Sequence, residues 1–127
     1  MQKLRVQFMI LKTDWKLRAY PKETIDLEFT AFFDDLDAEV LLNGIKPESM
    51  DDKWFVYSEN GWVYFVRSWT GAYIYGIKLH PTPAGGSKVI ESWVTGNADD
   101  YRCKSVVQER ELLSMIIKFL FKVESHA

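Results

Sequence analysis

The chain has 127 residues, of which 47% are hydrophobic and 27% charged, a composition typical of one globular domain and not of a disordered chain. Its formal net charge of -2 lacks the basic excess of nucleic-acid-binding proteins, so nucleic acid is not an expected partner. The single cysteine, Cys103, excludes an internal disulfide, and the N-terminal apolar run is too short for a signal peptide or a membrane span. We therefore expect a cytoplasmic protein without membrane contact.

The N-terminal part alternates between apolar and other residues. Residues Lys3 to Leu11 place Leu4, Val6, Phe8 and Ile10 on one side, which predicts a β-strand. The following segment, Thr13 to Tyr20, is mixed in character and precedes Pro21, which favours an extended conformation. We interpret it as a connecting arm that Trp15 and Leu17 pin to the core.

A helical period starts at about Thr24. Steps of four, three, one, three and four residues separate six apolar side chains, Ile25, Phe29, Phe32, Phe33, Leu36 and Val40. This spacing predicts one α-helix from Thr24 to a stop at Asn43-Gly44. The acidic run Asp34, Asp35 and Asp37 lacks the glycine and the distal glutamate of a calcium loop, so we interpret it as a solvated helix face.

The stretch from Asp51 to Leu79 predicts a three-stranded antiparallel meander rich in aromatic residues. Type I′ turns at Asn60-Gly61 and Thr70-Gly71 would pair Phe55 with Val66 and Val66 with Tyr75. One face then carries Phe55, Tyr57, Trp62, Tyr64, Val66, Tyr73, Tyr75, Ile77 and Leu79, and is the natural seat for a helix. The other carries Trp54, Val63, Phe65, Arg67, Trp69 and Lys78 and is the better candidate for a pocket.

The C-terminal third supplies a loop, a strand and a helix. Residues 80–87 are rich in proline and glycine, and 88–95 predict a fourth strand of open register. A last helix, capped by Asn97 or Asp99, is expected to run to about Val123. Together these elements predict an α+β domain, with a four- or five-stranded antiparallel sheet and two helices packed mainly on one face.

No catalytic, cofactor or metal signature emerges from the sequence. Cys103 would have a lowered pKa only if Arg102 and Lys104 converge on it, and a plain cysteine beside a helix is the commoner case. Arg67 is the residue of greatest interest, because a guanidinium in the middle of a strand must be paired, stacked or offered to a ligand. Trp54 faces it across the hairpin, and Glu91 is the obvious salt-bridge partner.

The segment SMDDKWFVYSENGWVYFVRSWTGAYIY, with TIDLEFTAFFDDLDAEVLLNG ahead of it, resembles a small family of uncharacterised bacterial proteins. The shared core has the form DDKWF, then GW-YF, then RSWTG. The resemblance also implies an association with macro domains, which handle ADP-ribose. The resemblance implies no activity, and it implies only that residues 67–71 belong to the hallmark of the family, where Thr70-Gly71 can be simple turn chemistry.

The leading functional hypothesis is a non-catalytic binding or accessory protein. It would recognise an anionic, nucleotide-like ligand or a protein partner through candidate residues on the sheet, namely Arg67, Trp54, Trp69, Lys78, Glu91 and Tyr73. The first alternative is a small enzyme acting on a nucleotide or ADP-ribosyl group, with Glu91, Tyr73 or Asp52 as acid or base. The second is an immunity or antitoxin type of interaction protein, including a homodimer formed through the last helix. No cofactor and no metal are expected.

Overall fold

The computed structural model describes residues 9–123 and has an α+β architecture. Six strands form one antiparallel sheet of order β1-β6-β5-β4-β3, with β2 also pairing β6, and two α-helices complete the fold. Their bounds are β1 Thr24–Asp26, β2 Phe32–Phe33, α1 Asp35–Asn43, β3 Trp54–Glu59, β4 Trp62–Arg67, β5 Tyr73–Pro81, β6 Ser87–Thr95 and α2 Val106–Phe121. This arrangement confirms the predicted fold class.

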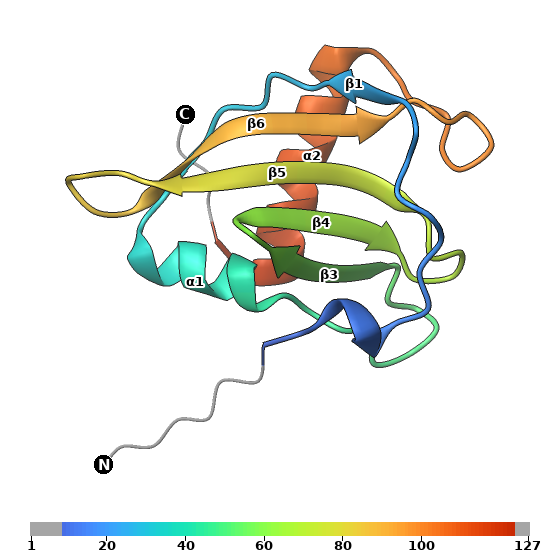
Figure 1. Ribbon diagram of the computed structural model, residues 1–127, viewed down its shortest axis with the longest axis horizontal. Coiled ribbons are helices and arrows are strands. Elements are labelled where there is room, and N and C mark those ends of the chain that lie inside the picture. The colour runs from blue at the N-terminus through green and yellow to red at the C-terminus, as the bar shows by residue number, and fades with distance from the viewer. Residues whose placement is uncertain (1–8, 124–127) are drawn as a thin grey trace.

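Both helices contribute to one hydrophobic core on the same side of the sheet. Figure 1 shows α2 crossing behind the strands and α1 lying beside them. We call this core the helix-side cluster. Its main members are Ala38 and Leu41 of α1, Leu113, Ile117 and Phe121 of α2, and Val56, Val63, Phe65, Tyr75, Ile77 and Leu79 of the sheet.

The long helix predicted from Thr24 is wrong in its first half. Residues 24–33 form β1, β2 and a non-helical segment between them, in which Glu28 has a φ of 52°. The buried side chains here alternate, as Leu27, Phe29, Ala31 and Phe33. A period of two is typical of a strand. The predicted helical stripe left out Leu27 and Ala31, so the alternation was not recognised.

The second half of that prediction holds, because α1 starts at Asp35 and ends at Asn43. Asp34 is its N-cap, with its side chain accepting a hydrogen bond from the Asp37 N–H at 2.8 Å. The Asp35 carboxylate accepts another from the Gly86 N–H. Two residues of the acidic run therefore have structural roles: Asp34 caps α1, and Asp35 joins α1 to the β5–β6 turn. The sequence predicted only a solvated helix face.

The first hairpin of the meander is confirmed. Asn60 and Gly61 have φ values of 54° and 86°, as a type I′ turn requires, and Phe55 pairs with Val66 as predicted.

The second hairpin has a different register. Val66 pairs with Tyr73 and Phe65 with Tyr75, so that Ile74 is an extra, bulged residue. The connection is also longer than two residues, since the Arg67 N–H donates to the Ala72 carbonyl. As a result, Tyr73 and Tyr75 point to opposite faces of the sheet.

The expected roles of the two faces of the sheet are reversed. Trp54, Val63 and Phe65, from the face expected to hold a pocket, pack under the helices. The other face forms what we call the arm-side cluster. It consists of Phe55, Tyr57, Tyr64, Val66, Tyr73 and Trp93, with Ile10, Trp15, Leu17 and Trp62 packed against it.

The arm of residues 9–23 covers this second face in part, and in Figure 1 it passes along one end of the strands. Trp15 stacks on Phe55 with ring centroids 5.6 Å apart, and Leu17 packs beside it, which confirms the pinned arm. The strand predicted for 3–11 falls mostly outside the described residues, and Met9 to Leu11 are not in a strand.

The C-terminal elements match the prediction more closely. β6 covers the expected fourth strand, and its register includes a bulge between the Lys78–Glu91 and Leu79–Val89 pairs. Because β5 extends to Pro81, the irregular loop is shorter than expected. Ser105, and not Asn97 or Asp99, caps α2, with its hydroxyl accepting a hydrogen bond from the Gln108 N–H.

Candidate functional site

The β4–β5 turn, which contains the RSWTG sequence, is held in place by hydrogen bonds to distant segments. The Ser68 N–H donates to the Lys53 carbonyl at 2.8 Å, and the Ser68 hydroxyl donates to the Asp52 carbonyl at 2.7 Å. In turn, the Ser68 carbonyl accepts the indole N–H of Trp15 at 2.9 Å. Ser68 therefore joins the turn to both the β3 entrance and the arm.

Gly71 completes this connection. Its φ of 77° is in the left-handed region, and a Cβ atom there would lie 2.4 Å from the Lys16 carbonyl oxygen. The Gly71 carbonyl accepts the Arg18 N–H at 2.9 Å, and its own N–H donates to the Arg67 carbonyl. Ser68 and Gly71 thus have structural roles in the RSWTG turn.

Arg67 lies between two aromatic rings. Its Cζ atom is 5.0 Å from the ring centroid of Trp54, its partner across the hairpin, and 6.0 Å from that of Tyr101. The Nε atom is enclosed and has no hydrogen-bond partner. Within residues 9–123, no side-chain hydrogen bond or ion pair engages the partly exposed guanidinium. Its two outer nitrogens therefore remain available to an external acceptor.

A buried carboxylate lies on the other side of Tyr101. Glu109, in the first turn of α2, is 0% exposed and accepts hydrogen bonds from three donors. These are the Tyr75 hydroxyl at 2.6 Å, the Tyr101 hydroxyl at 2.8 Å and the Lys104 N–H at 2.7 Å. Every partner donates to Glu109, which is the pattern of an ionised carboxylate. Tyr101 consequently links the buried negative charge of Glu109 to the positive charge of Arg67.

The environment of these tyrosines favours their neutral forms. Burial raises the pKa of Tyr75, and the hydrogen bond to Glu109 raises it further. Burial also raises the pKa of Tyr101, whereas the charge of Arg67 acts in the opposite direction. Both hydroxyls therefore remain protonated donors near neutral pH.

Sequence reasoning did not identify Glu109 or Tyr101 as site residues. One signal was present, since Glu109 is three residues after Val106 and four before Leu113, in line with the apolar stripe of the last helix. A carboxylate on the buried stripe of a helix needs hydrogen-bond donors opposite it. The sequence predicted that Tyr75 is on a strand. The face of the sheet to which Tyr75 points depends on the bulge at Ile74, which the sequence did not predict.

The structure does not bring all the expected site residues together. Trp54 and Arg67 are adjacent, as predicted. Lys78 lies on the arm side, with Nζ 5.9 Å from the Trp62 ring centroid, and Glu91 pairs with Lys78 and is exposed. Since residues paired across strands project to the same face, Glu91 lies on the face opposite Arg67, and the predicted salt bridge is wrong.

Within residues 9–123, none of the remaining expected residues bonds to the guanidinium. Tyr73 is buried in the arm-side cluster, where its hydroxyl is 2.6 Å from that of Tyr57. The Asp52 carboxylate accepts the Glu48 N–H in the loop before β3. Trp69 is 72% exposed, and its indole N–H donates to the Met50 carbonyl at 2.9 Å.

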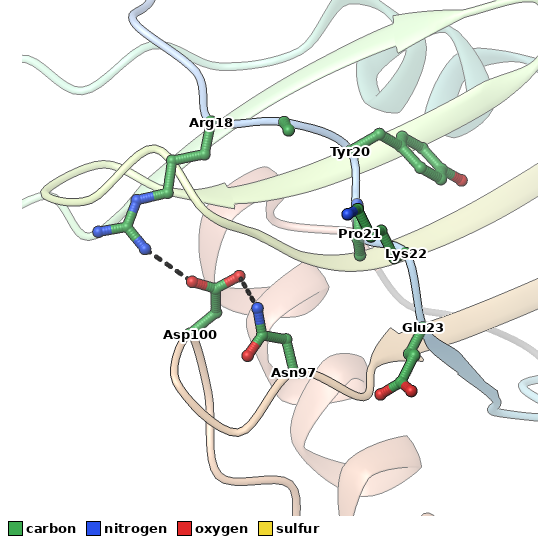
Figure 2. A pocket seen from close by; sticks show the side chains of 8 residues that line it. Arg18, Tyr20, Pro21, Lys22, Glu23, Asn97 and Asp100 are labelled. Atoms are coloured by element: carbon green, nitrogen blue, oxygen red, sulfur yellow. Dashed lines mark hydrogen bonds and ion pairs between the residues drawn. The ribbon is translucent and has the colours of Figure 1, made fainter.

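Among the hollows formed by residues 9–123, three are lined by the arm and by the loops near it. The largest of these three, about 530 Å³, lies between residues 18–23 and the loop that follows β6, where Arg18 forms an ion pair with Asp100 at 2.7 Å. Figure 2 shows the Asn97 amide joined to the same carboxylate, and the Tyr20 ring turned away from these two residues. The other two, about 310 and 380 Å³, lie beside Trp69. Arg67 lines none of these three hollows.

The described residues give little support for a reactive thiol or a metal site. Burial raises the pKa of the Cys103 thiol, with the charge of Glu109 adding to the effect, so the lowered pKa considered for it is wrong. Residues 9–123 contain no group of three or more His, Cys, Asp or Glu side chains placed to hold a metal ion. Over the same range, no helix is both long and apolar enough to cross a bilayer.

Comparison with known proteins adds no relative to this description. No family model, curated protein or solved structure matches the chain. The resemblance through the RSWTG core therefore stays a prediction, and any functional proposal depends on the geometry of the site.

Proposed function

We propose that this chain is a non-catalytic binding protein that recognises an oxyanion of a nucleotide-like ligand through Arg67. The observation that carries the proposal is the stacking of the guanidinium between Trp54 and Tyr101 without a hydrogen-bond partner in residues 9–123. A cytoplasmic location, as expected from the sequence, is part of this proposal.

Stacking on two rings suits a guanidinium for anion recognition. Aromatic rings that contact the flat faces of a guanidinium leave its N–H edge free to bind an acceptor. That edge presents parallel donors that match the oxygen spacing of a phosphate or a carboxylate. Because the side chain is already held in place, binding costs less conformational entropy than it would for a free arginine.

The aromatic neighbours support the nucleotide-like part of the proposal. Trp54 and Tyr101 are only partly buried, so their edges border the position that an anion would take beside Arg67. Aromatic side chains beside a cation are a common way to hold a base or a ribose next to its phosphate. Buried Glu109 offsets the charge of Arg67 in the ligand-free protein without using its N–H groups.

The proposal is tested by calorimetric titration of the whole chain with ADP-ribose, ADP and inorganic phosphate. We expect binding of at least one nucleotide, and a loss of about tenfold or more in affinity for Arg67→Lys, which keeps the charge but not the planar fork. Arg110→Lys is the matched control, because the Arg110 guanidinium already donates to the Leu27 carbonyl. Wild-type affinity in Arg67→Lys, or no binding of any probe, would exclude the site.

The structure gives less support to the enzyme alternative. Its candidate acids and bases lie on different faces or loops, with Glu91 facing solvent on the arm side and Tyr73 enclosed beside Tyr57. General acid or base catalysis needs such a group within hydrogen-bond reach of the reacting atom. Glu91 and Tyr73 therefore do not meet that condition at Arg67, and the Asp52 carboxylate accepts the Glu48 N–H within its own loop.

The homodimer alternative keeps one specific observation. Three residues of α2 at intervals of four or eight positions, Val107, Met115 and Phe119, are 55%, 66% and 72% exposed. They form a partly apolar stripe on the outer side of the helix. Sedimentation of the wild type and of Phe119→Asp over a range of concentrations tests self-association. A monomer at every concentration would exclude it.

A further inference from the structure

Trp69 is exposed but held in a fixed position. Its indole N–H donates to the Met50 carbonyl, while the residue before it makes three hydrogen bonds with Asp52, Lys53 and Trp15. An exposed tryptophan leaves a large apolar area in water. Because the neighbouring backbone is fixed, Trp69 would lose little conformational freedom when a partner covers it.

Two hollows flank this ring and share Trp15, Ser68 and Trp69 in their walls. The first, of about 310 Å³, is completed by Pro47, Glu48, Ser49 and Met50, whose side chain is 79% exposed. The second, of about 380 Å³, is completed by Lys16, Leu17, Arg18, Thr70 and Gly71. An extended peptide that crosses Trp69 would place one side chain in each hollow.

The charges of the two hollows differ. The walls of the second contain two cations, Lys16 and Arg18, and no carboxylate. Arg18 is already paired with Asp100, whereas Lys16 has no ion pair or side-chain hydrogen bond to any residue from 9 to 123. The first hollow is lined mainly by apolar surface of Pro47, Met50 and Trp69, with Glu48 as its charged residue. Complementarity therefore calls for an acidic side chain beside Lys16 and an apolar one beside Met50.

We propose that the surface around Trp69 binds an extended segment of a partner protein that carries an acidic residue next to an apolar residue. Trp69 is the central aromatic anchor, as in interfaces where one well-packed tryptophan carries much of the binding energy. The segment lies across the β4–β5 turn and contacts the arm on one side and the 47–50 loop on the other. Arg67 lines neither hollow, so this surface is a second site, separate from the one proposed above.

A displayed library of random twelve-residue peptides, selected on the whole immobilised chain, provides the probe. We expect the selected peptides to share a carboxylate close to an apolar residue. The most enriched peptide, made synthetically, should bind Trp69→Ala about 30-fold more weakly than the wild type. For Lys16→Glu we expect a loss of about tenfold, because the acidic residue would then meet a like charge.

Matched variants test whether a loss of peptide binding is specific to this surface. Phe119→Ala removes an aromatic ring that is also 72% exposed, and Lys22→Glu reverses an exposed charge on the same arm that lines neither hollow beside Trp69. Both should bind the peptide like the wild type. Arg67→Lys should also leave peptide affinity unchanged, whatever it does to nucleotide binding.

Several outcomes would overturn the inference. One is a selection that enriches no peptide on the wild type beyond the level found on Trp69→Ala, and another is a set of enriched peptides without acidic residues. Equal affinity of the peptide for the wild type and Trp69→Ala would also exclude the surface. Thermal unfolding of Trp69→Ala, in which only an exposed ring is removed, checks that loss of binding does not reflect loss of folding.

Discussion

The two sides of the sheet bury polar groups in different ways. On the helix side, Glu109 is enclosed with its hydrogen-bond partners Tyr75, Tyr101 and Lys104, and Arg67 stacks nearby. On the arm side, the enclosed polar groups are neutral, and the closest contact is the 2.6 Å pair of Tyr57 and Tyr73 hydroxyls. The face of the sheet that α2 covers therefore encloses a carboxylate, and the face that the arm covers encloses hydroxyl groups.

The difference follows from the cost of burying a charge. An ionised carboxylate without enough donors is far more costly to enclose than a hydroxyl. The start of α2 supplies Lys104 N–H and favours negative charge through the helix dipole, and the sheet adds Tyr75. The arm supplies no comparable set of donors to a buried charge: Tyr20 packs its ring against Tyr64 and Tyr73, and its hydrogen bond with Tyr64 joins two neutral hydroxyl groups. The helix side, which holds the charges, also carries the proposed anion site. Substitutions on each side can test whether the two sides differ in the cost of losing a buried polar group.

The largest effect is expected from Glu109→Ala on the helix side. This change leaves the Tyr75 and Tyr101 hydroxyls and the Lys104 N–H without their acceptor and opens a cavity. We expect the free energy of unfolding to fall by about 3–5 kcal/mol. Denaturant unfolding measures it, with Glu111→Ala on the exposed side of the same helix as the control. A loss below about 1 kcal/mol would show that Glu109 is not part of the stabilising core.

Alkaline pH should weaken both sides of the sheet. Burial raises the pKa of Tyr57 and Tyr64 on the arm side and of Tyr75 on the helix side above the ordinary value of 10.0. Because the unfolded chain loses these protons first, their contribution is fully present below about pH 10 and declines as the pH rises further. We expect a loss of roughly 1 kcal/mol per buried tyrosine between pH 10 and 11.

Denaturant unfolding at a series of pH values up to 11 provides that measurement. The Tyr57→Phe, Tyr73→Phe double variant serves as the control, because it lacks one of the titrating groups with a raised pKa, and its stability should decline less steeply. A stability that is flat from pH 9 to pH 11 would contradict the burial of these hydroxyls.

Local residues predicted the parts of the fold in which neighbours in sequence decide the conformation. The Asn60-Gly61 turn forces φ values that few other residues accept, so it fixed the first hairpin and the pairing of Arg67 with Trp54. The β4–β5 turn is held instead by Asp52, Lys53 and the arm. Such distant contacts leave no local signal, which is why the second register was wrong.

The same limit applied to the first helix and to the candidate site. Between Thr24 and Phe33 the apolar residues fit a period of two as well as a helical stripe, and only pairing with β6 decides between them. Tyr101 lies beside Arg67, and Glu109 accepts a hydrogen bond from Tyr75 of β5, only because the loop before α2 and the start of α2 pack against the sheet. Tyr75 and Glu109, which share a hydrogen bond, are 34 residues apart in sequence.

The smallest effect is expected on the arm side, where the Tyr57 and Tyr73 hydroxyls bond to each other. Either Tyr57→Phe or Tyr73→Phe leaves one enclosed hydroxyl without its partner, at a cost of about 1–2 kcal/mol. The double variant removes both polar groups and keeps both rings, so it should be nearly as stable as the wild type. A double-mutant cycle in denaturant measures this coupling. If the two losses simply add, water and not the opposite hydroxyl is the partner of each tyrosine, and the arm does not seal this face of the sheet.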